Sequence, residues 1–523
     1  MVPSPFPSLT NGFGWTDPTA MPDRLPLLGR TPITYSSAIR KNYNVLRELD
    51  YVTAIKKQYT DLWAQRESIE ALVRYHLRLG NEHVCTVLNP QEWIQGAFNI
   101  CVLVEVASSA GLTTKFVFRC PKPHRLVGIV DEKMGSEVGA YVWVQEKCRH
   151  VRVPHLFGFG FSDGRQFTHV ARRPFYIRIL HALRRSVYSL FQLPILSQYT
   201  NASTAPSIRS SYMLLEHIGS ETGQMLSTTL DKHKSDPGRR QRLFHGMSRI
   251  MLSLARIPQP HIGSFRFHDD GTISLTNRYL SCSLAILENE GAPRSISRND
   301  LHTCTDSFAS DLVTFHDGRF LAQPNAAFSE NDCRGQMATM SLLRAISHRY
   351  IKREYRRGPY LLELTDINPS NIFVDQDWNV KCLIDLEWIC ALPVEMMDVP
   401  YWLTGCSIEN IQGEEYDKYD KVRQEFMSIL EKEEDEAMME HGISIPKIMK
   451  EMWDSKGVWF WHCLTSVDAM NFLLEDHLCP SACLSSEVER AVSEFWCDDA
   501  SHVVEMKLAD KAKYDDLLKS RFG

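Results

Sequence analysis

Apolar side chains recur at helical spacing in residues 41–80, where Ile69 and Val73 lie on one face. In residues 100–120 the spacing changes. The runs ICVLVEV and TKFVFRC are continuous stretches of strand-forming residues, and the turn-like SSAGL lies between them. Two such runs around a glycine-containing turn predict an antiparallel hairpin. Helical spacing returns in residues 131–148, so the pattern predicts a helix, a hairpin and a second helix in this order.

The remainder of the chain contains both kinds of pattern. Helical spacing predicts helices over 237–260 and 334–356, and over most of 405–523. The stretch SFRFHDDGTISLTNR at 264–278 is predicted to be a hairpin, because Asp-Asp-Gly between two alternating runs suits a tight turn. Long helices together with short hairpins predict an α+β protein.

An insert over 164–210 differs in charge from the rest of the chain, because it contains arginines and no acidic residue. On a helical wheel over 175–191 the apolar residues share one face and the basic residues share the opposite face. We interpret this segment as a surface helix whose apolar face packs on the protein and whose basic face meets water. The alternative is a weak peripheral contact of residues 172–191 with a membrane surface or an acidic partner.

Composition limits the classes of function. The 523 residues carry a net charge of −6 with a sequence pI of about 6.4, which argues against binding of nucleic acid. The 14 cysteines lack the regular spacing of a disulfide framework, and the first residues lack the features of a signal peptide. No run of about 18 or more apolar residues occurs, so no membrane span is predicted. We expect a cytoplasmic protein with reduced cysteines; its oligomeric state stays open.

Two short blocks, TDINPSN and KCLIDLEW, concentrate carboxylates and amides around a predicted two-strand hairpin. Phosphoryl transfer needs a carboxylate that holds the acceptor hydroxyl and hard oxygen ligands for Mg²⁺. A D-x-x-x-x-N loop, followed by an aspartate at the end of the next hairpin, supplies both the carboxylate for the acceptor and the oxygen ligands for Mg²⁺. Asp366 would face the acceptor, while Asn371 and Asp385 would bind Mg²⁺. Glu387 lies two residues further along the predicted strand, so its side chain would point the same way as that of Asp385.

Taken alone, Asp366 and Asn371 are ordinary turn residues, since Asp and Asn are common in loops. The hairpin and the later carboxylates favour the functional interpretation, because both spacing and context fit. Asp385 adds a physical argument: a carboxylate that ends the apolar run CLI is costly to bury unless it is paired or bound to a metal.

These residues resemble the signature of the aminoglycoside phosphotransferase and choline kinase family, in which H-x-D-x-x-x-x-N is followed by I-D-x-E/D. The chain matches this signature at Asp366, Asn371, Ile384, Asp385 and Glu387. It looks closest to the large, mostly uncharacterised fungal set of aminoglycoside-phosphotransferase-domain proteins.

The resemblance covers roughly residues 90–400 and implies a nucleotide site in the first half of that range. WIQGAFNICVLVEV is similar to the family's glycine-bearing nucleotide loop and its first two strands. Arg119 corresponds to the family's phosphate-contacting cation, and Glu137 corresponds to the helix glutamate that pairs with this cation. The run MLLEH corresponds to the hinge segment that contacts adenine. The nucleotide-binding residues implied in this way are Gly96, Phe98, Asn99, Arg119, Glu137, Leu215 and Glu216.

The family's fold is that of the protein kinases, so the resemblance implies a bilobal protein with a small antiparallel-sheet N-lobe and a mainly helical C-lobe. Prolines, which a helix interior or a central strand does not tolerate, mark the first residues as a strap. The expected segments are a Pro-rich N-terminal strap (1–40), an N-terminal helical segment (41–85), an N-lobe with the basic insert (86–218), a C-lobe with the catalytic loop and metal-binding strand (219–404), and the helical C-terminal part of the C-lobe (405–523).

The implied activity is ATP- and Mg²⁺-dependent phosphorylation of a hydroxyl group on a small-molecule acceptor. Asp366 would be the catalytic residue, and Asn371, Asp385 and Glu387 would be the metal ligands. The sequence does not identify the acceptor. Leu364 departs from the family signature, which has a histidine at this place. This departure keeps open the alternative of a nucleotide-binding pseudokinase that acts as a regulatory scaffold without turnover.

Overall fold

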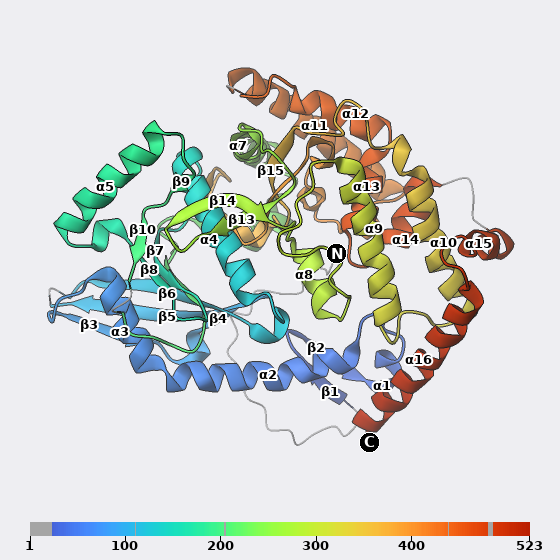
Figure 1. Ribbon diagram of the computed structural model, residues 1–523, viewed down its shortest axis with the longest axis horizontal. Helices are drawn as coiled ribbons and strands as arrows, with labels where there is room; N and C mark the ends of the chain where they lie inside the picture. The colour runs from blue at the N-terminus through green and yellow to red at the C-terminus, as the bar shows by residue number, and fades with distance from the viewer. Residues whose placement is uncertain (1–23, 110, 203–204, 438, 480–484) are drawn as a thin grey trace.

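The computed structural model describes residues 24–109, 111–202, 205–437, 439–479 and 485–523 (Figure 1). Helices make up 50% of it and strands 18%, and the strands within each sheet pair antiparallel, which confirms the predicted α+β class. Among the described residues, no helix combines the length and the apolar character that crossing a bilayer requires.

The largest sheet has eight strands in the order β10-β8-β7-β11-β6-β5-β3, and β4 also pairs with β5. Its centre is the predicted hairpin of residues 100–120, in which nine residues of one strand face nine of the other, from Asn99 opposite Pro121 to Ala107 opposite Thr113. The strands are β3 (His83–Val87), β4 (Ile94–Gln95), β5 (Asn99–Ser108), β6 (Thr113–Pro121), β7 (Leu156–Gly160), β8 (Gln166–His169), β10 (Tyr199–Asn201) and β11 (Tyr212–Glu216).

Two helices, α2 (Val45–Ala64) and α3 (Arg66–Leu77), precede this sheet and confirm the helical pattern of residues 41–80. The predicted apolar face of α3 is fully buried at Ile69 and Val73. His76 lies on the same face, where its ring nitrogens are 2.8 Å from the Thr168 hydroxyl and 2.7 Å from the Tyr212 hydroxyl. Burial lowers the pKa of His76 to about 3, so this histidine is a neutral part of the core.

Helix α4 (Val130–Lys147), predicted at 131–148, links the large sheet to a second sheet through β13 (Gly263–Phe267). Gly139 allows this contact, because a Cβ atom there would lie 2.5 Å from the Cβ of Phe265. One turn further on, Trp143 packs on the same phenylalanine with 5.4 Å between ring centroids. The depth of α4 in the core is therefore set by a glycine in its middle.

The second sheet has the order β15-β18-β13-β14-β9, and a third, small sheet has the order β12-β16-β17. Strands β13 and β14 form the predicted hairpin of 264–278, with Gly271 at a φ of +86° in its turn. The strands not yet given are β9 (Ile195–Leu196), β12 (Gln224–Met225), β14 (Thr272–Asn277), β15 (Tyr360–Leu364), β16 (Ile372–Val374), β17 (Val380–Leu383) and β18 (Ile389–Pro393).

Much of the remaining chain is helical, as predicted for 237–260 and 405–523 (Figure 1). The helix predicted over 334–356 exists as α10, but it ends at Ile346, and a short 3-10 turn follows to Arg349. The acidic helix α11 buries one apolar face, including Phe426 and Leu430. These helices are α6 (Leu230–His233), α7 (Pro237–Ala255), α8 (Cys282–Asn289), α9 (Thr305–Ala322), α10 (Glu330–Ile346), α11 (Glu414–Glu436), α12 (Ile445–Asp454), α13 (Gly457–Thr465), α14 (Met470–Leu473), α15 (Ser486–Ser493) and α16 (Ala500–Arg521).

The predicted N-terminal strap of residues 1–40 is described only from residue 24, and residues 1–23 lie outside the described part of the chain. From there it forms a two-stranded sheet, β1 (Arg24–Leu27) with β2 (Arg30–Thr34), and a short helix α1 (Tyr35–Ala38). Prolines are tolerated in both strands because each strand is an edge. This segment packs with α16, whose Tyr514 hydroxyl accepts a hydrogen bond of 2.9 Å from the Val45 amide.

The insert helix α5 (Phe175–Leu190) exists as predicted, but the prediction that its apolar face packs on the protein is wrong. Its apolar side chains are exposed, and its polar side faces the protein: His181 is buried, and Arg185 pairs with Glu146 at 2.8 Å. Figure 1 shows α5 at the outer end of the molecule, beyond β9 and β10. The physical reason is that the buried His181, which hydrogen-bonds to Ser197, and the ion pair of Arg185 hold the polar side of the helix on the protein.

We predict that Gly139→Ala lowers the free energy of unfolding by about 1–3 kcal/mol, because the added methyl group overpacks the contact with Phe265. Gly135 on the same helix is the matched control, since its nearest neighbouring atom would lie 3.8 Å from a new Cβ. Gly135→Ala should leave the free energy of unfolding unchanged or raise it, because alanine favours a helix over glycine. Denaturant unfolding measures both, and equal effects of the two substitutions would contradict a close contact at Gly139.

Candidate functional site

The loop between β15 and β16 carries Asp366 and Asn371, and hydrogen bonds hold it in place. The Asn371 side-chain amide donates to the Asp366 carbonyl oxygen at 3.2 Å. The backbone carbonyl oxygen of Asn371 accepts a hydrogen bond of 2.9 Å from the backbone amide of Ile384. The loop is therefore attached to the segment that follows β17, which carries Asp385 and Glu387.

Asp385 and Glu387 do not lie on a strand, and this part of the sequence prediction is wrong. Strand β17 ends at Leu383, and Asp385 has a left-handed backbone conformation with a φ of +64°. This conformation costs an L-residue roughly 1–2 kcal/mol, and Asp is one of the few residues that visit it. The turn at Asp385, and not the alternation of a strand, directs both carboxylates toward Arg119.

Arg119 on β6 is the centre of a buried cluster of charges. One guanidinium nitrogen pairs with Glu137 on α4, and the other lies 2.5 Å from Asp385 and 3.0 Å from Glu387. Burial disfavours the charge of Arg119, but Asp385, Glu137 and Glu387 hold its pKa well above the usual value. The structure thus brings together four of the residues that the sequence selected.

Lys133 is the second cation of this cluster, and sequence reasoning missed it. Its buried Nζ donates to Glu137 at 2.8 Å and to the Asn99 side-chain oxygen at 3.3 Å, and it pairs with Glu387. Burial lowers the pKa of Lys133, yet Glu137 and Glu387 raise it above the usual value. A signal was present, because Lys133 precedes Glu137 by one helical turn, the spacing at which side chains of opposite charge meet on a helix.

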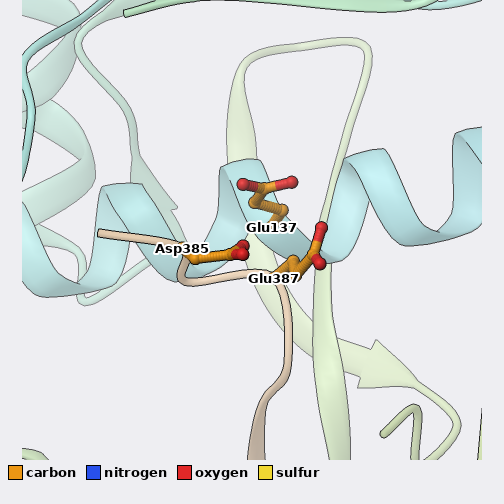
Figure 2. Close-up of side chains that lie close together, drawn as sticks. All are labelled: Glu137, Asp385 and Glu387. Carbon is orange, nitrogen blue, oxygen red and sulfur yellow. The ribbon is translucent and has the colours of Figure 1, made fainter. Parts of the chain in front are cut away.

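Three carboxylates therefore meet two cations, which leaves one negative charge uncompensated. One oxygen from each of Glu137, Asp385 and Glu387 lies within 4.8 Å of the other two, and Figure 2 shows the three side chains close together. Carboxylate oxygens of this kind suit Mg²⁺, which takes one or two of them in a protein site. Asp385 is 30% exposed and the other two are at most 3% exposed, so Asp385 is the ligand that a metal ion could reach.

Asn371, the third predicted metal ligand, ends the short turn Pro369–Asn371 in the loop that carries Asp366. It lines a cavity of about 10 Å³ together with Asp366 and Asp385. This volume holds about one water molecule, so a nucleotide requires a more open arrangement of the site. The complete lining is Leu364, Thr365, Asp366, Ile367, Asn371, Leu383, Ile384, Asp385 and Trp388.

Asp366 lies in surroundings that favour its protonated form. Burial, and after it the negative charges of Asp385 and Glu387, raise the pKa of Asp366 to about 7. A hydrogen bond from the Cys282 thiol opposes this rise but does not cancel it. Burial also raises the pKa of Asp385 to about 6, against the lowering effect of Arg119. A carboxylate that titrates near neutral pH can take a proton from a hydroxyl group, which is the task of a general base.

The predicted glycine-bearing loop is the tight turn between β4 and β5. The Gly96 amide donates to the Asn99 carbonyl oxygen at 3.0 Å, and the buried Lys122 Nζ donates to the Gly96 carbonyl oxygen at 2.6 Å. Phe98 is buried, and the Asn99 side chain donates to Glu387 at 2.8 Å. The Asn99 side chain therefore anchors this turn to the charged cluster.

Leu215 and Glu216, predicted to form the adenine hinge, end strand β11. Leu215 is buried, and the Glu216 carboxylate accepts bonds of 2.8 Å from Arg152 and 3.0 Å from the His155 amide. Among the hydrogen bonds and ion pairs of the described residues, none joins Glu216 to Arg119 or its partners. The structure therefore places these two residues on the strand that pairs with β6 of Arg119, but not in the cluster.

Two residues beside Asp366 could not be selected as site residues from the sequence. Cys282 begins α8, and its thiol donates to the Asp366 carboxylate, but nothing in its neighbours distinguishes it from the other cysteines. Tyr401 lies close enough that burial, and then the charges of Asp366 and Asp398, raise the pKa of its hydroxyl. Only the fold brings these side chains to the loop of Asp366.

A comparison of the chain with protein-family models and a comparison with curated proteins both find no match. The interpretation of the site therefore depends on its residues and their geometry. The central features are Asp366 with a pKa near neutral pH and the cluster around Arg119.

We predict that Asp366→Asn stabilises the fold, and that its advantage grows as the pH rises from about 4 to 7. The folded-state pKa of Asp366, about 7, exceeds its ordinary value of 3.8, so ionisation costs stability as the pH rises. The cost reaches at most about 4 kcal/mol above pH 7. Denaturant unfolding at pH 5 and pH 8 measures it.

Asp375→Asn is the matched control, because hydrogen bonds from Asn379 and Lys381 outweigh burial and lower the pKa of Asp375 to about 2. The Asp375 carboxylate stabilises the fold above pH 4 and loses this effect as the pH falls to 2. Asp375→Asn should therefore destabilise the fold at both pH 5 and pH 8. An Asp366→Asn variant that is less stable than the wild type at pH 8 would refute the raised pKa.

Proposed function

We propose that the protein transfers a phosphoryl group from ATP to a hydroxyl group of a small molecule, in a bilobal fold like that of the protein kinases. The observation that carries the proposal is the cluster in which Arg119 of β6, Glu137 of α4, and Asp385 with Glu387 meet. The loop of Asp366 is hydrogen-bonded to the same segment. The eight-stranded sheet with α4 would be the N-lobe, and the helices from α7 onward would belong to the C-lobe.

The roles of the residues follow from their chemistry. When bound, ATP would supply the phosphoryl group and Mg²⁺ would neutralise the charge that develops during its transfer. Asp366 would hold the acceptor hydroxyl group and take its proton on a carboxylate oxygen. Asp385 would hold the metal together with Asn371 and Glu387, all of them oxygen ligands of the hard type that Mg²⁺ prefers.

Arg119 would contact the phosphates, and Glu137 would hold it in place. In the arrangement described here Arg119 pairs with Asp385 at 2.5 Å, and the nearby cavity holds about one water molecule. Asp385 would therefore leave Arg119 when it binds metal, and the released guanidinium would turn to the phosphate oxygens. Glu137 and Lys133 would keep the cluster together during this exchange, because both remain buried and paired.

A nucleotide-binding scaffold without turnover is the second candidate, and Leu364 is the observation that favours it. Leu364 ends β15, opposite Ile389 of β18, and packs against the main core. A leucine at this place cannot form the hydrogen bonds of the histidine that the family signature has there. Its packing would nevertheless support the loop of Asp366, so Leu364 is compatible with either function and turnover has to be measured.

We predict that the purified protein consumes ATP with at least one acceptor from a library of hydroxyl-bearing metabolites. Asp366→Asn should lower kcat by at least about 100-fold, because the acceptor loses its general base. Asp385→Asn should abolish turnover, because the metal loses its accessible ligand. Asp375→Asn, the same chemical change in the turn between β16 and β17, should leave turnover unchanged. Coupled detection of ADP measures all four proteins.

Two outcomes would contradict this proposal in different ways. Mg²⁺-dependent ATP binding without turnover on any acceptor would support the scaffold instead. A wild-type protein whose melting temperature does not change with ATP and Mg²⁺ would remove both candidates.

A further inference from the structure

Helix α5 presents an apolar face to solvent. Its side chains Phe175, Ile179, Leu180, Leu183, Val187 and Leu190 are each between 49% and 78% exposed. Phe191 and Leu193, directly after the helix, continue this surface with 67% and 47% exposure. An exposed apolar patch of this kind on a helix marks an interaction surface, because water does not stabilise it.

The opposite side of α5 holds the helix on the protein. The buried His181 ring donates a bond of 2.8 Å to the Ser197 carbonyl oxygen, and Arg185 pairs with Glu146 of α4 at 2.8 Å. These polar contacts fix which face points outward. The apolar face is therefore available in the folded protein without any rearrangement.

Arginines flank the exposed face on both sides. At about 100° per residue the six apolar side chains span an arc of about 140°, from Phe175 to Leu180. Arg178 lies about 60° outside one edge of this arc, and Arg184 lies about 40° outside the other. Apolar side chains with basic residues along both edges are the pattern of a helix that lies in the interface of a bilayer.

The charge of the surrounding insert agrees with an anionic partner. Residues 164–210 contain seven arginines and no acidic residue, although the whole chain carries −6. Among the described residues no carboxylate lies within ion-pair distance of Arg178, and the contact of Arg184 with Asp270 is long, at 3.9 Å. Both guanidinium groups can therefore bind phosphate oxygens, for which their planar geometry is suited.

We propose that α5 docks the protein on an anionic phospholipid surface, with its apolar face between the lipid headgroups and Arg178 and Arg184 on lipid phosphates. A second copy of this chain is a poorer occupant, because two such faces would bring the flanking arginines of both copies together. The docking is weak and reversible, since it depends on one helix. It does not depend on the phosphotransfer proposed above, whose residues lie on other elements.

Flotation with phosphatidylcholine vesicles, with and without about 30 mol% phosphatidylserine, tests the proposal. The wild type should bind the vesicles that contain phosphatidylserine and bind those without it far more weakly. Leu180→Glu with Leu183→Glu should lower binding at least tenfold, and since the two side chains are 65% and 60% exposed, the melting temperature should not change. Leu112→Glu with Val127→Glu, at 71% and 69% exposure outside the helix, is the matched control and should bind like the wild type.

The basic residues are tested separately with Arg178→Glu and Arg184→Glu together. This variant should lose the preference for phosphatidylserine, while Arg149→Glu with Arg353→Glu, two exposed arginines elsewhere, should keep it. A wild type that does not float with either vesicle would overturn the proposal. Vesicle binding by the Leu180 and Leu183 double variant that equals the binding of the wild type would also overturn the proposal. A stable dimer that only this double variant disrupts would assign the face to self-association and also overturn docking on lipid.

Discussion

The ion pairs of Arg119 with Glu137, Asp385 and Glu387 connect parts of the chain that lie far apart in sequence. They join the large sheet, helix α4 and the segment after β17. Breaking one pair of a buried group of charges leaves an unpaired charge and costs about 3–5 kcal/mol. The position of α4 is constrained from its other side as well, because Gly139 meets Phe265 of β13. The site and the packing of the core are thus parts of one arrangement.

The same region contains features that reduce stability. Asp366 and Asp385 both have raised pKa values because they are buried close to other carboxylates, and Asp385 also has a left-handed backbone. Such features persist only where the surroundings enforce them, and they concentrate at functional sites. Here the surroundings are the cations Arg119 and Lys133, which offset most of the negative charge. This combination supports the proposal that the cluster is a binding site and not only a structural one.

Periodicity predicted the helices and hairpins well, and the burial of α3 and α11 follows the spacing of their apolar residues. It could not predict the turn at Asp385, since a single left-handed residue leaves no mark on a pattern of apolar positions. It also assigned the wrong face of α5 to the protein. A sequence shows that two faces differ, but the contacts of His181 and Arg185 with other elements decide which face is buried. The charged cluster was predicted in part, without Lys133.

The central claim is that Asp385 leaves Arg119 in order to bind Mg²⁺ and a nucleotide. Titration calorimetry with a non-hydrolysable ATP analogue, with and without Mg²⁺, tests it most directly. We expect binding that requires Mg²⁺ in the wild type and is lost in Asp385→Asn. Binding of equal strength without Mg²⁺, or in Asp385→Asn, would contradict it.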